Sequence, residues 1–387
     1  MVVQAGIPQE QKATPTVAKR LVALDGLRGL TVLLMLLVNN VALDDATPDQ
    51  LTHAPFGGVS LADLVFPWFL FCMGAAIPYA HASFLKQKLS VWAYMQKALV
   101  RSIALFAIGL FLTSVLARAP VFALGVLQLI ALAYFVAAVI YVFSPRPLPL
   151  LMVSGILLVG YWAALRFVPV PGAGPGIFEE DRNLLLYLNQ TYLEPLGLRG
   201  LLSVIPTTAL ALLGAVVSQI LRAPVRKKEV GPDAKVTDPA AKPRLMSLEL
   251  IALGTVLTLV GWLWSFSLPF SKTFWTSPYI LFSAGLGTLV IALFYLLFDL
   301  RGWRFLAFPL TVPGSNALLA YVAPILFKVW VLQGWSVGGQ SLQKLWLNSM
   351  VGLSGPVIGG WLYTLSYIAA WWLILLWLNR KGVFLRV

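Results

Sequence analysis

The sequence LADLVFPWFLFCMGAAIPYA, from Leu61 to Ala80, decides the fold. Its one charged residue is Asp63 and its two prolines are Pro67 and Pro78, while the other residues are apolar, aromatic or small. A helix rises about 1.5 Å per residue, so about 20 such residues cross the hydrocarbon core of a bilayer. This stretch therefore predicts a membrane-spanning helix.

The rest of the chain has the same character. Of its 387 residues, 59% are hydrophobic and 11% are charged, and the mean hydropathy is +0.84. A soluble domain is roughly 45–50% apolar and about 25% charged. The composition excludes a soluble enzyme, a nucleic-acid-binding protein and a disordered scaffold. It predicts an all-α, polytopic integral membrane protein.

Hydropathy predicts about ten membrane-spanning helices, and the positive-inside rule orients them. With both termini cytoplasmic, 20 of the 28 Lys and Arg residues lie in inside segments, six lie outside and two lie within spans. The net charge of +13 thus indicates an N-in, C-in topology rather than nucleic-acid binding. The predicted spans lie near residues 24–42, 59–81, 98–117, 121–143, 148–168, 200–221, 247–266, 278–299, 305–332 and 354–379.

Charge and proline content divide the chain into four segments. A polar cytoplasmic tail at 1–20 precedes a six-helix half at 21–221, the candidate catalytic half because it holds most of the ionisable groups discussed below. A basic cytoplasmic linker at 222–246 leads to a four-helix half at 247–387. The residues from Phe84 to Leu99 predict a short helix in the membrane interface.

Two charged residues mark the start of the first span. Asp25 and Arg28 are three residues apart, so they share one face of a helix and can form an ion pair. Such a pair can anchor the inner end of the helix, or it can help to bind an anionic cofactor from the cytoplasm. The sequence leaves both roles open.

Polar residues also gather at the outer ends of the first two spans. The first span ends with Asn39 and Asn40, His53 lies in the following loop, and Asp63 begins the second span. Histidine is the side chain best suited to proton transfer near neutral pH, and Asn39, Asn40 or Asp63 could orient it. The alternative is a solvated loop histidine without a catalytic role.

Proline predicts two local breaks in the helices. Pro67 cannot donate a hydrogen bond to the carbonyl of Asp63, four residues earlier, so we expect that carbonyl to be freed. The segment Pro313–Asn316 predicts a broken ninth span, whose second half begins near Ser315 and directs its positive N-terminus at an anionic group. A simple proline kink is the alternative there.

The sequence resembles the heparan-α-glucosaminide N-acetyltransferase family over nearly the whole membrane region. The block ADLVFPWF, Ala62–Phe69, is highly specific, and the other blocks are weak singly but follow in the same order. They are Asp25-x-x-Arg28-Gly29, Leu37-Val38-Asn39, His53-Ala54, Met73-Gly74, Gly125–Gln128, Glu194–Leu198, Leu213-Gly214, Lys272–Trp275 and Pro313–Asn316.

The resemblance implies a transmembrane enzyme that moves an acetyl group from cytosolic acetyl-CoA to an amino sugar. It implies that His53 and Asn39 are catalytic, and we add Asp63 as the group that fixes the tautomer of the imidazole. It also implies a set of residues that bind acetyl-CoA. The candidates are Asp25, Arg28, Gln128, Lys272, Trp275, Ser315 and Asn316, although Lys272 and Trp275 could instead be interfacial anchors.

Two departures from the family pattern limit what the resemblance implies. Leu129 stands where the family usually has arginine, which puts part of the cofactor site in doubt. The large luminal N-terminal region of the animal enzyme is missing from this sequence. We therefore expect a bacterial-type relative in the cytoplasmic membrane, whose acceptor is sugar-like but is not heparan.

The sequence thus predicts transfer of an acyl group from acyl-CoA to an amine or hydroxyl, either directly or through an acyl-histidine. No metal site is predicted, because the chain has two histidines and one cysteine, Cys72. Alternatives are a transporter or flippase, a non-catalytic membrane assembly subunit, and the integral acyltransferase-3 family, which LDGLRG at 24–29 resembles. The last lacks its expected histidine here, since Asn39 and Asn40 stand in that place. A homodimer is also left open.

Overall fold

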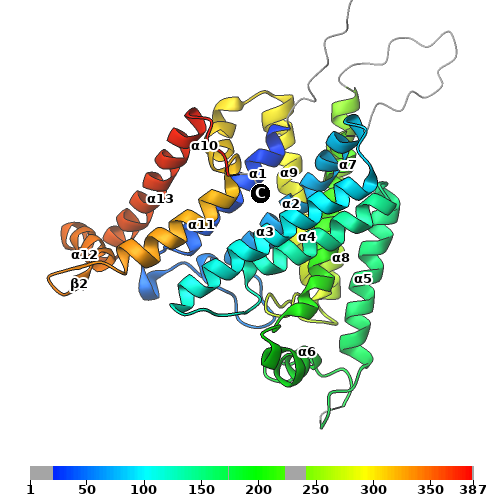
Figure 1. The fold of residues 1–387 in the computed structure, drawn as a ribbon, viewed down its shortest axis with the longest axis horizontal. Coiled ribbons are helices and arrows are strands. Elements are labelled where there is room, and N and C mark those ends of the chain that lie inside the picture. The colour runs from blue at the N-terminus through cyan, green and yellow to red at the C-terminus, as the bar shows by residue number, and fades with distance from the viewer. Residues whose placement is uncertain (1–20, 173, 223–240, 386–387) are drawn as a thin grey trace, which may run out of the picture.

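The structure is a computed structural model that describes residues 21–172, 174–222 and 241–385. The predicted cytoplasmic tail and most of the predicted linker lie outside the described residues. Within them the protein is almost entirely helical, with a single two-stranded hairpin, and Figure 1 shows the helices as a bundle of unequal tilts. The predicted all-α fold class is confirmed.

The described residues form thirteen α-helices and one hairpin. Short π-helical segments continue α9 at Tyr295–Leu300 and α11 at Lys328–Leu332. The helices are α1 (Val22–Val38), α2 (Leu61–Lys86), α3 (Val91–Ala117), α4 (Val126–Phe143), α5 (Pro147–Phe167), α6 (Leu184–Leu188), α7 (Val204–Arg222), α8 (Ala241–Trp264), α9 (Ser277–Phe294), α10 (Arg304–Gly314), α11 (Ala317–Phe327), α12 (Leu342–Ser354) and α13 (Pro356–Arg380), and the strands are β1 (Ser336–Val337) and β2 (Gln340–Ser341).

The long helices make this an integral membrane protein. Among the described residues, eight helices are long and apolar enough to cross a bilayer, and the pair α10 and α11 makes a ninth if it is one bent span. The helix at the first predicted span, α1, has 17 residues and ends at Val38. Each of the ten predicted spans therefore coincides with a helix or with the bent pair.

The break in the bent pair falls where the sequence predicts it. Helix α10 ends at Gly314, α11 begins at Ala317, and the two are inclined by 60°. Pro313 interrupts the helical hydrogen bonds just before the break. The predicted break is confirmed, and α11 begins directly after Asn316; that the two helices form one span stays a prediction.

Helices α2 and α7 cross closely at the centre of the fold. In both, 78% of the most apolar 18-residue window is buried, against 28% in α3 and α5. A Cβ atom added to Gly74 would lie 1.9 Å from the carbonyl oxygen of Ala211, and one added to Gly214 would lie 2.1 Å from that of Phe71. Glycine is needed at both positions, because the two backbones touch there.

The two predicted halves share one hydrophobic core. Helix α9, from the second half, packs against α1, α2 and α7 of the first, and α1 also packs against α10 and α13. One cluster of buried residues runs through helices of both halves. The chain can still be divided at the predicted linker, but the described helices on its two sides are interleaved in space.

Two predicted boundaries differ from the structure. The interfacial helix expected from Phe84 to Leu99 is wrong: α2 continues to Lys86, and α3 begins at Val91 as one long helix. The reason is local, because the Ser90 hydroxyl accepts a hydrogen bond from the Ala93 N–H at 3.2 Å and so caps α3 at that point. Helix α8 begins at Ala241, inside the last part of the predicted linker.

Candidate active site

The predicted polar residues lie around a cavity of about 640 Å³, which we call the outer cavity. The loop before α2, the α3–α4 loop and the α8–α9 loop supply most of its lining, and Glu180, Arg199, Gly200 and Ser203 supply the rest outside the α-helices. His53, Asp63, Lys272 and Trp275 all line this cavity. The structure thus brings together four of the ten predicted site residues, from positions more than 200 residues apart.

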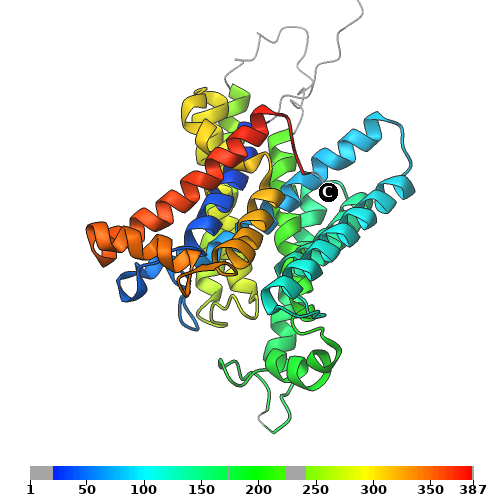
Figure 2. The same cartoon turned by 60° about the vertical axis from the view of Figure 1, so that its left-hand side comes forward.

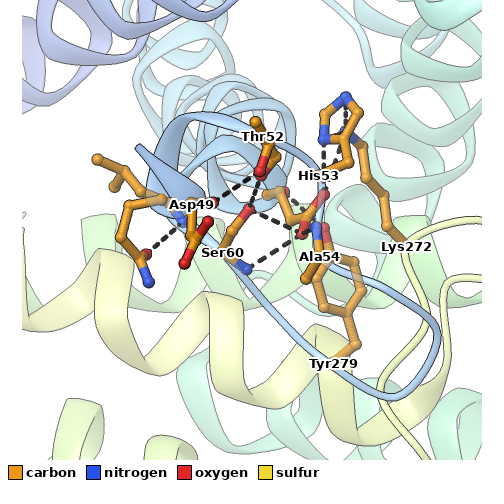
Figure 3. A network of polar contacts seen from close by, with 10 residues as sticks. Asp49, Thr52, His53, Ala54, Ser60, Lys272 and Tyr279 are labelled. Atoms are coloured by element: carbon orange, nitrogen blue, oxygen red, sulfur yellow. Dashed lines mark hydrogen bonds and ion pairs between the residues drawn. The ribbon is translucent and has the colours of Figure 1, made fainter. Parts of the chain in front are cut away.

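His53 and Asp63 form a hydrogen-bonded pair in the outer cavity. Nδ1 of His53 lies 2.8 Å from Oδ1 of Asp63, and Figure 3 shows His53 in the polar network with Ala54, Ser60 and Lys272. The histidine side chain is 60% exposed to the cavity, whereas the aspartate side chain is 4% exposed. A carboxylate only accepts hydrogen bonds, so the proton of a neutral imidazole lies on Nδ1 and the lone pair lies on Nε2.

Asp63 is fixed by the start of α2. Its Oδ2 accepts hydrogen bonds from the backbone N–H of Ala54 at 3.1 Å, the N–H of Ser60 at 3.1 Å and the Ser60 hydroxyl at 3.0 Å. Ser60 is the N-cap of α2 and Asp63 is its third residue, so the bond to the Ser60 N–H is half of a capping box. The positive end of the helix also favours a carboxylate there.

The carbonyl freed by Pro67 has a partner that the sequence did not indicate. The hydroxyl of Tyr279, on α9, donates a 2.6 Å hydrogen bond to the carbonyl oxygen of Asp63 (Figure 3). Tyr279 is fully buried, so this bond satisfies a group that would otherwise be unpaired inside the protein. The break at Pro67 thereby ties the backbone of the candidate site to α9.

Lys272, which lies in the α8–α9 loop, is the third member of the polar group formed by His53 and Asp63. Its Nζ lies 3.2 Å from Nε2 and 3.1 Å from Nδ1 of His53, and 3.6 Å from Oδ1 of Asp63. Since Nδ1 carries the proton, Nε2 is the ring atom that accepts from the ammonium. Burial lowers the pKa of Lys272 from its ordinary value, and the Asp63 carboxylate, which raises it, offsets only part of that effect.

The α8–α9 loop is held rigidly beside the histidine loop. The N–H of Gly57 donates to the carbonyl of Phe270 at 3.1 Å, which joins the two loops backbone to backbone. Trp275 has φ of +51° and is 5% exposed, and its ring meets Phe66 edge-on with centroids 5.1 Å apart. The left-handed backbone at Trp275 is held by this packing. Lys272 is therefore presented from a loop with little freedom.

Asn39 does not lie beside His53. It lines a separate cavity of about 390 Å³, formed by α1, α3, α11 and α13, and its carbonyl accepts a 2.7 Å hydrogen bond from Nζ of Lys328. The neighbouring Asn40 donates from Nδ2 to the carbonyl of Leu36 at 2.8 Å. Asp63, rather than either asparagine, orients the imidazole, because α1 ends at Val38 and turns Asn39 toward α11.

Arg28 and Ser315 line a second cavity of about 460 Å³, which we call the inner cavity. The predicted pair of Asp25 and Arg28 is confirmed, with Oδ1 and Nη1 3.3 Å apart. Arg101 also lines this cavity, so two guanidinium groups and a hydroxyl face it. Such a donor set fits the phosphates of an acyl-CoA.

The inner and outer cavities share two walls. Phe69 of α2 lines the inner cavity and Phe66, one turn away, lines the outer cavity. On α4, Leu127 lines the inner cavity and Leu129 lines the outer cavity. Leu129, at the position where the family usually has arginine, thus faces the cavity that holds His53.

The other two predicted cofactor residues make contacts within the protein. Gln128 is 1% exposed, and its Nε2 donates to Oγ1 of Thr113 at 3.1 Å and to the carbonyl of Ala123 at 3.0 Å. It holds the α3–α4 loop, which lines the outer cavity. Asn316 bonds to the backbone of Val383 and Leu385, each at 3.1 Å, beside the inner cavity. Their roles in cofactor binding stay predictions.

Sequence reasoning missed three partners of Asp63: Ser60, the Ala54 N–H and Tyr279. The pattern Ser60-x-x-Asp63 was a usable signal, because it is a capping-box spacing. Tyr279 carries no such signal, since it lies 216 residues from Asp63. Within the described part of the chain there is no group of three or more His, Cys, Asp or Glu residues placed to hold a metal ion.

Comparisons with known proteins identify the family of this chain. The family model described as heparan-alpha-glucosaminide N-acetyltransferase, catalytic, matches residues 20–249, which is more than half of the chain. The human heparan-alpha-glucosaminide N-acetyltransferase is 24% identical over 95% of this chain, and the mouse enzyme of that name is 26% identical over 84%. The chain covers 60% and 56% of their lengths. It belongs to the heparan-alpha-glucosaminide N-acetyltransferase family.

Proposed function

We propose that the protein is a transmembrane acetyltransferase that moves an acetyl group from acetyl-CoA to an amine or hydroxyl of a sugar-like acceptor. The observation that carries the proposal is the hydrogen-bonded pair of His53 and Asp63 in a cavity that shares walls with a second, basic cavity. The names of the two relatives support the same reaction class. The proposed location is a bacterial cytoplasmic membrane, in line with the charge distribution.

The inner cavity is the proposed donor site. Arg28, which is three-tenths exposed, and Ser315 would hold phosphate groups there, and the Asp25 carboxylate keeps the Arg28 side chain in place. The coenzyme supplies the acyl group as an activated thioester. The shared walls at Phe66 and Phe69 are apolar, which suits the less polar arm of the coenzyme.

His53 is the proposed general base. Asp63 holds the proton on Nδ1, so Nε2 can accept a proton from the amine or hydroxyl of the acceptor. As the imidazole becomes positively charged, the buried carboxylate stabilises that charge. The same Nε2 could instead attack the thioester and form an acyl-histidine, the other route that the sequence left open.

Lys272 is the proposed electrostatic partner. Its ammonium lies 3.2 Å from Nε2, so the acceptor must displace that contact before Nε2 can take its proton. When the acceptor reaches Nε2, the ammonium is positioned to stabilise negative charge that develops on the carbonyl oxygen of the thioester. Trp275 gives the cavity an aromatic wall of the kind that packs against sugar rings.

Proteoliposomes with a separate lumen test this proposal. Purified protein is reconstituted with [¹⁴C]acetyl-CoA on one side and glucosamine on the other, and both labelled product and acceptor flux are measured. We expect labelled N-acetylglucosamine on the acceptor side, dependent on both substrates. Glucosamine flux that needs no acetyl-CoA, with no labelled product, would support a transporter and contradict the proposal.

A further inference from the structure

A fourth cavity, of about 560 Å³, lies between the end of α2 and the first half of α3. We call it the hairpin cavity, because α2 and α3 form a helical hairpin that projects from the bundle at the upper right of Figure 2. Lys97, Arg101, Tyr94 and Phe84 line it. Arg101 also lines the inner cavity, whereas Lys97, Tyr94 and Phe84 line neither the inner nor the outer cavity.

The hairpin cavity is strongly basic. Lys97 and Arg101 are four residues apart on α3, so they share one face of the helix. The Lys97 ammonium lies 5.1 Å from the centre of the Phe84 ring, and the Arg101 guanidinium lies 4.9 Å from that of Tyr134. Both cations are thus held over aromatic rings that also line the cavity.

These charges have no acidic partner nearby in the sequence. Between Asp63 and Glu179 the chain contains no Asp or Glu, and every residue that lines the hairpin cavity lies in that stretch. Among the described residues, neither Lys97 nor Arg101 forms an ion pair with a carboxylate. A cation at a membrane helix without a counter-charge is costly, and such residues mark candidate functional sites.

Two buried polar atoms at this cavity also lack partners in the described part of the chain. The hydroxyl of Tyr94 is buried without a hydrogen bond, and the whole residue is 3% exposed. Nε of Arg101 is likewise buried and unpaired. Buried polar groups are nearly always satisfied, so a hydroxyl and a guanidinium N–H beside one cavity indicate a ligand rich in acceptor oxygens.

The cavity opens toward the outer surface of the bundle rather than toward its core. Val100, which lines it, is 65% exposed, and Ile103, one turn further on, is 59% exposed. Only 28% of the most apolar part of α3 is buried in the protein, so the rest of this spanning helix faces lipid. A ligand in the cavity can therefore have a charged group beside Arg101 and a hydrocarbon chain along α3.

We propose that the hairpin cavity binds the phosphate group of an anionic phospholipid. The phosphate would accept hydrogen bonds from Arg101, Lys97 and the Tyr94 hydroxyl, and an acyl chain would lie over Val100 and Ile103. The four basic residues Lys86, Lys88, Lys97 and Arg101 all lie in one segment that the charge distribution places on the cytoplasmic side, where anionic lipids concentrate. The site does not depend on the proposed acetyltransferase activity.

Lipid binding to the purified, delipidated full chain tests the site. Phosphatidylglycerol and phosphatidylcholine of the same acyl chains are titrated, and bound lipid is counted by native mass spectrometry. Each basic residue raises the affinity for an anionic lipid about fivefold, so Lys97 and Arg101 together predict that the wild type prefers phosphatidylglycerol about 30-fold. We expect the double variant Lys97→Gln, Arg101→Gln to lose that preference, and the control Arg146→Gln, at an exposed position before α5, to keep it.

Tyr94→Phe provides a second variant that keeps both charges and the ring packing. We expect it to weaken phosphatidylglycerol binding by several-fold while leaving phosphatidylcholine binding unchanged. Because Arg101 also lines the inner cavity, acetyl-CoA binding is measured in the same variants. The proposal would be overturned if the double variant kept the preference for phosphatidylglycerol. If that same variant also lost acetyl-CoA binding, the phosphate site would be assigned to the coenzyme instead.

Discussion

Nδ1 of His53 lies 2.8 Å from a carboxylate oxygen of Asp63, and the second oxygen of that carboxylate accepts three further hydrogen bonds. One oxygen therefore faces the imidazole, with Nζ of Lys272 3.6 Å away, while the other anchors the carboxylate to the start of α2. This division fixes both the orientation and the tautomer of the histidine. It leaves Nε2 of a neutral imidazole without a proton, 3.2 Å from the Lys272 ammonium.

The first prediction concerns Asp63. Replacement by Asn keeps the shape of the side chain but allows its amide to present N–H to Nδ1, which would move the imidazole proton to Nε2 and leave no base. We expect the kcat for acetyl transfer in Asp63→Asn to fall almost as far as in a variant without the histidine, with a smaller change in KM. Steady-state kinetics on purified protein measures both constants.

Asp45→Asn is the matched control for that variant. Asp45 is an exposed carboxylate in the loop between α1 and α2, and it does not line the outer cavity. Its replacement should leave both constants unchanged. If Asp63→Asn were as active as Asp45→Asn, Asp63 would have no part in orienting the base.

The second prediction concerns pH and Lys272. Its pKa lies below the ordinary lysine value of 10.5, so the ammonium loses its proton at a lower pH than an exposed lysine does. If the charge is needed, activity should decline as the pH rises through that lowered pKa. A guanidinium stays protonated, so Lys272→Arg should move the alkaline limb of the kcat/KM profile to higher pH.

Lys272→Met separates charge from side-chain length in this experiment. It should be slow at every pH and should show no alkaline limb from this group. An exposed lysine that lines none of the cavities above, Lys344, provides the control Lys344→Arg, which should leave the profile as in the wild type. An alkaline limb that is unchanged in Lys272→Arg would mean that another group controls it.

The third prediction concerns Tyr279. Removing its hydroxyl in Tyr279→Phe leaves the carbonyl of Asp63 buried without a partner, since Pro67 cannot supply one. We expect a loss of about 1 kcal/mol in unfolding free energy, the usual range for such bonds in membrane proteins, together with reduced kcat. Tyr295→Phe is the control, because the one hydrogen bond of that hydroxyl to a described residue goes to the sulfur of Met246, at 3.9 Å. Equal thermal shifts in the two variants would rule out a special role for Tyr279.

The fourth prediction concerns the crossing of α2 and α7. Gly74→Ala places a Cβ atom within 1.9 Å of the carbonyl oxygen of Ala211, so the helices must separate. Overpacking of this kind costs about 1–3 kcal/mol, which thermal unfolding in detergent can measure. Gly155→Ala, on α5, meets nothing within 4 Å and should be neutral or slightly stabilising. A neutral Gly74→Ala would show that the two helices are less closely packed.

Local patterns predicted much of this structure. The apolar runs coincide with helices, Asp25 pairs with Arg28 at helical spacing, and the chain breaks between Gly314 and Ala317. The freed carbonyl of Asp63 follows from the proline four residues later. Each of these features depends on residues close together in the sequence, where helical geometry alone determines which atoms meet.

The partners from distant helices could not be predicted in the same way. Lys272 meets His53 across 219 residues, and only the packing of α9 against α2 brings its loop to the cavity. Asn39 shows the reverse case: it is near His53 in the sequence, but α1 ends in a direction that places it beside Lys328. Proximity in sequence therefore did not indicate which polar residue orients the imidazole.

Some motifs behind the family resemblance have a packing role. Gly74 and Gly214 allow α2 and α7 to touch, and a Cβ atom on Gly314 would lie 2.2 Å from the carbonyl oxygen of Asp25, so that glycine lets α10 meet α1. The glycines in these motifs are needed for helix packing, so they indicate a shared fold and not a shared site. The blocks around His53, Asp63 and Lys272 differ, because their side chains meet in a cavity rather than in the core.

The central claim is that His53 accepts the proton of the acceptor during acetyl transfer. The most direct test is the rate at which purified protein in lipid nanodiscs transfers label from [¹⁴C]acetyl-CoA to glucosamine, compared between the wild type and His53→Ala. General-base catalysis of this kind contributes about 10²–10⁴-fold, so we predict a loss of that size. His81→Ala, which removes the other histidine, packed against Tyr94 and Tyr141, should keep the activity of the folded protein. A folded His53→Ala variant that transfers acetyl groups at the wild-type rate would contradict the account.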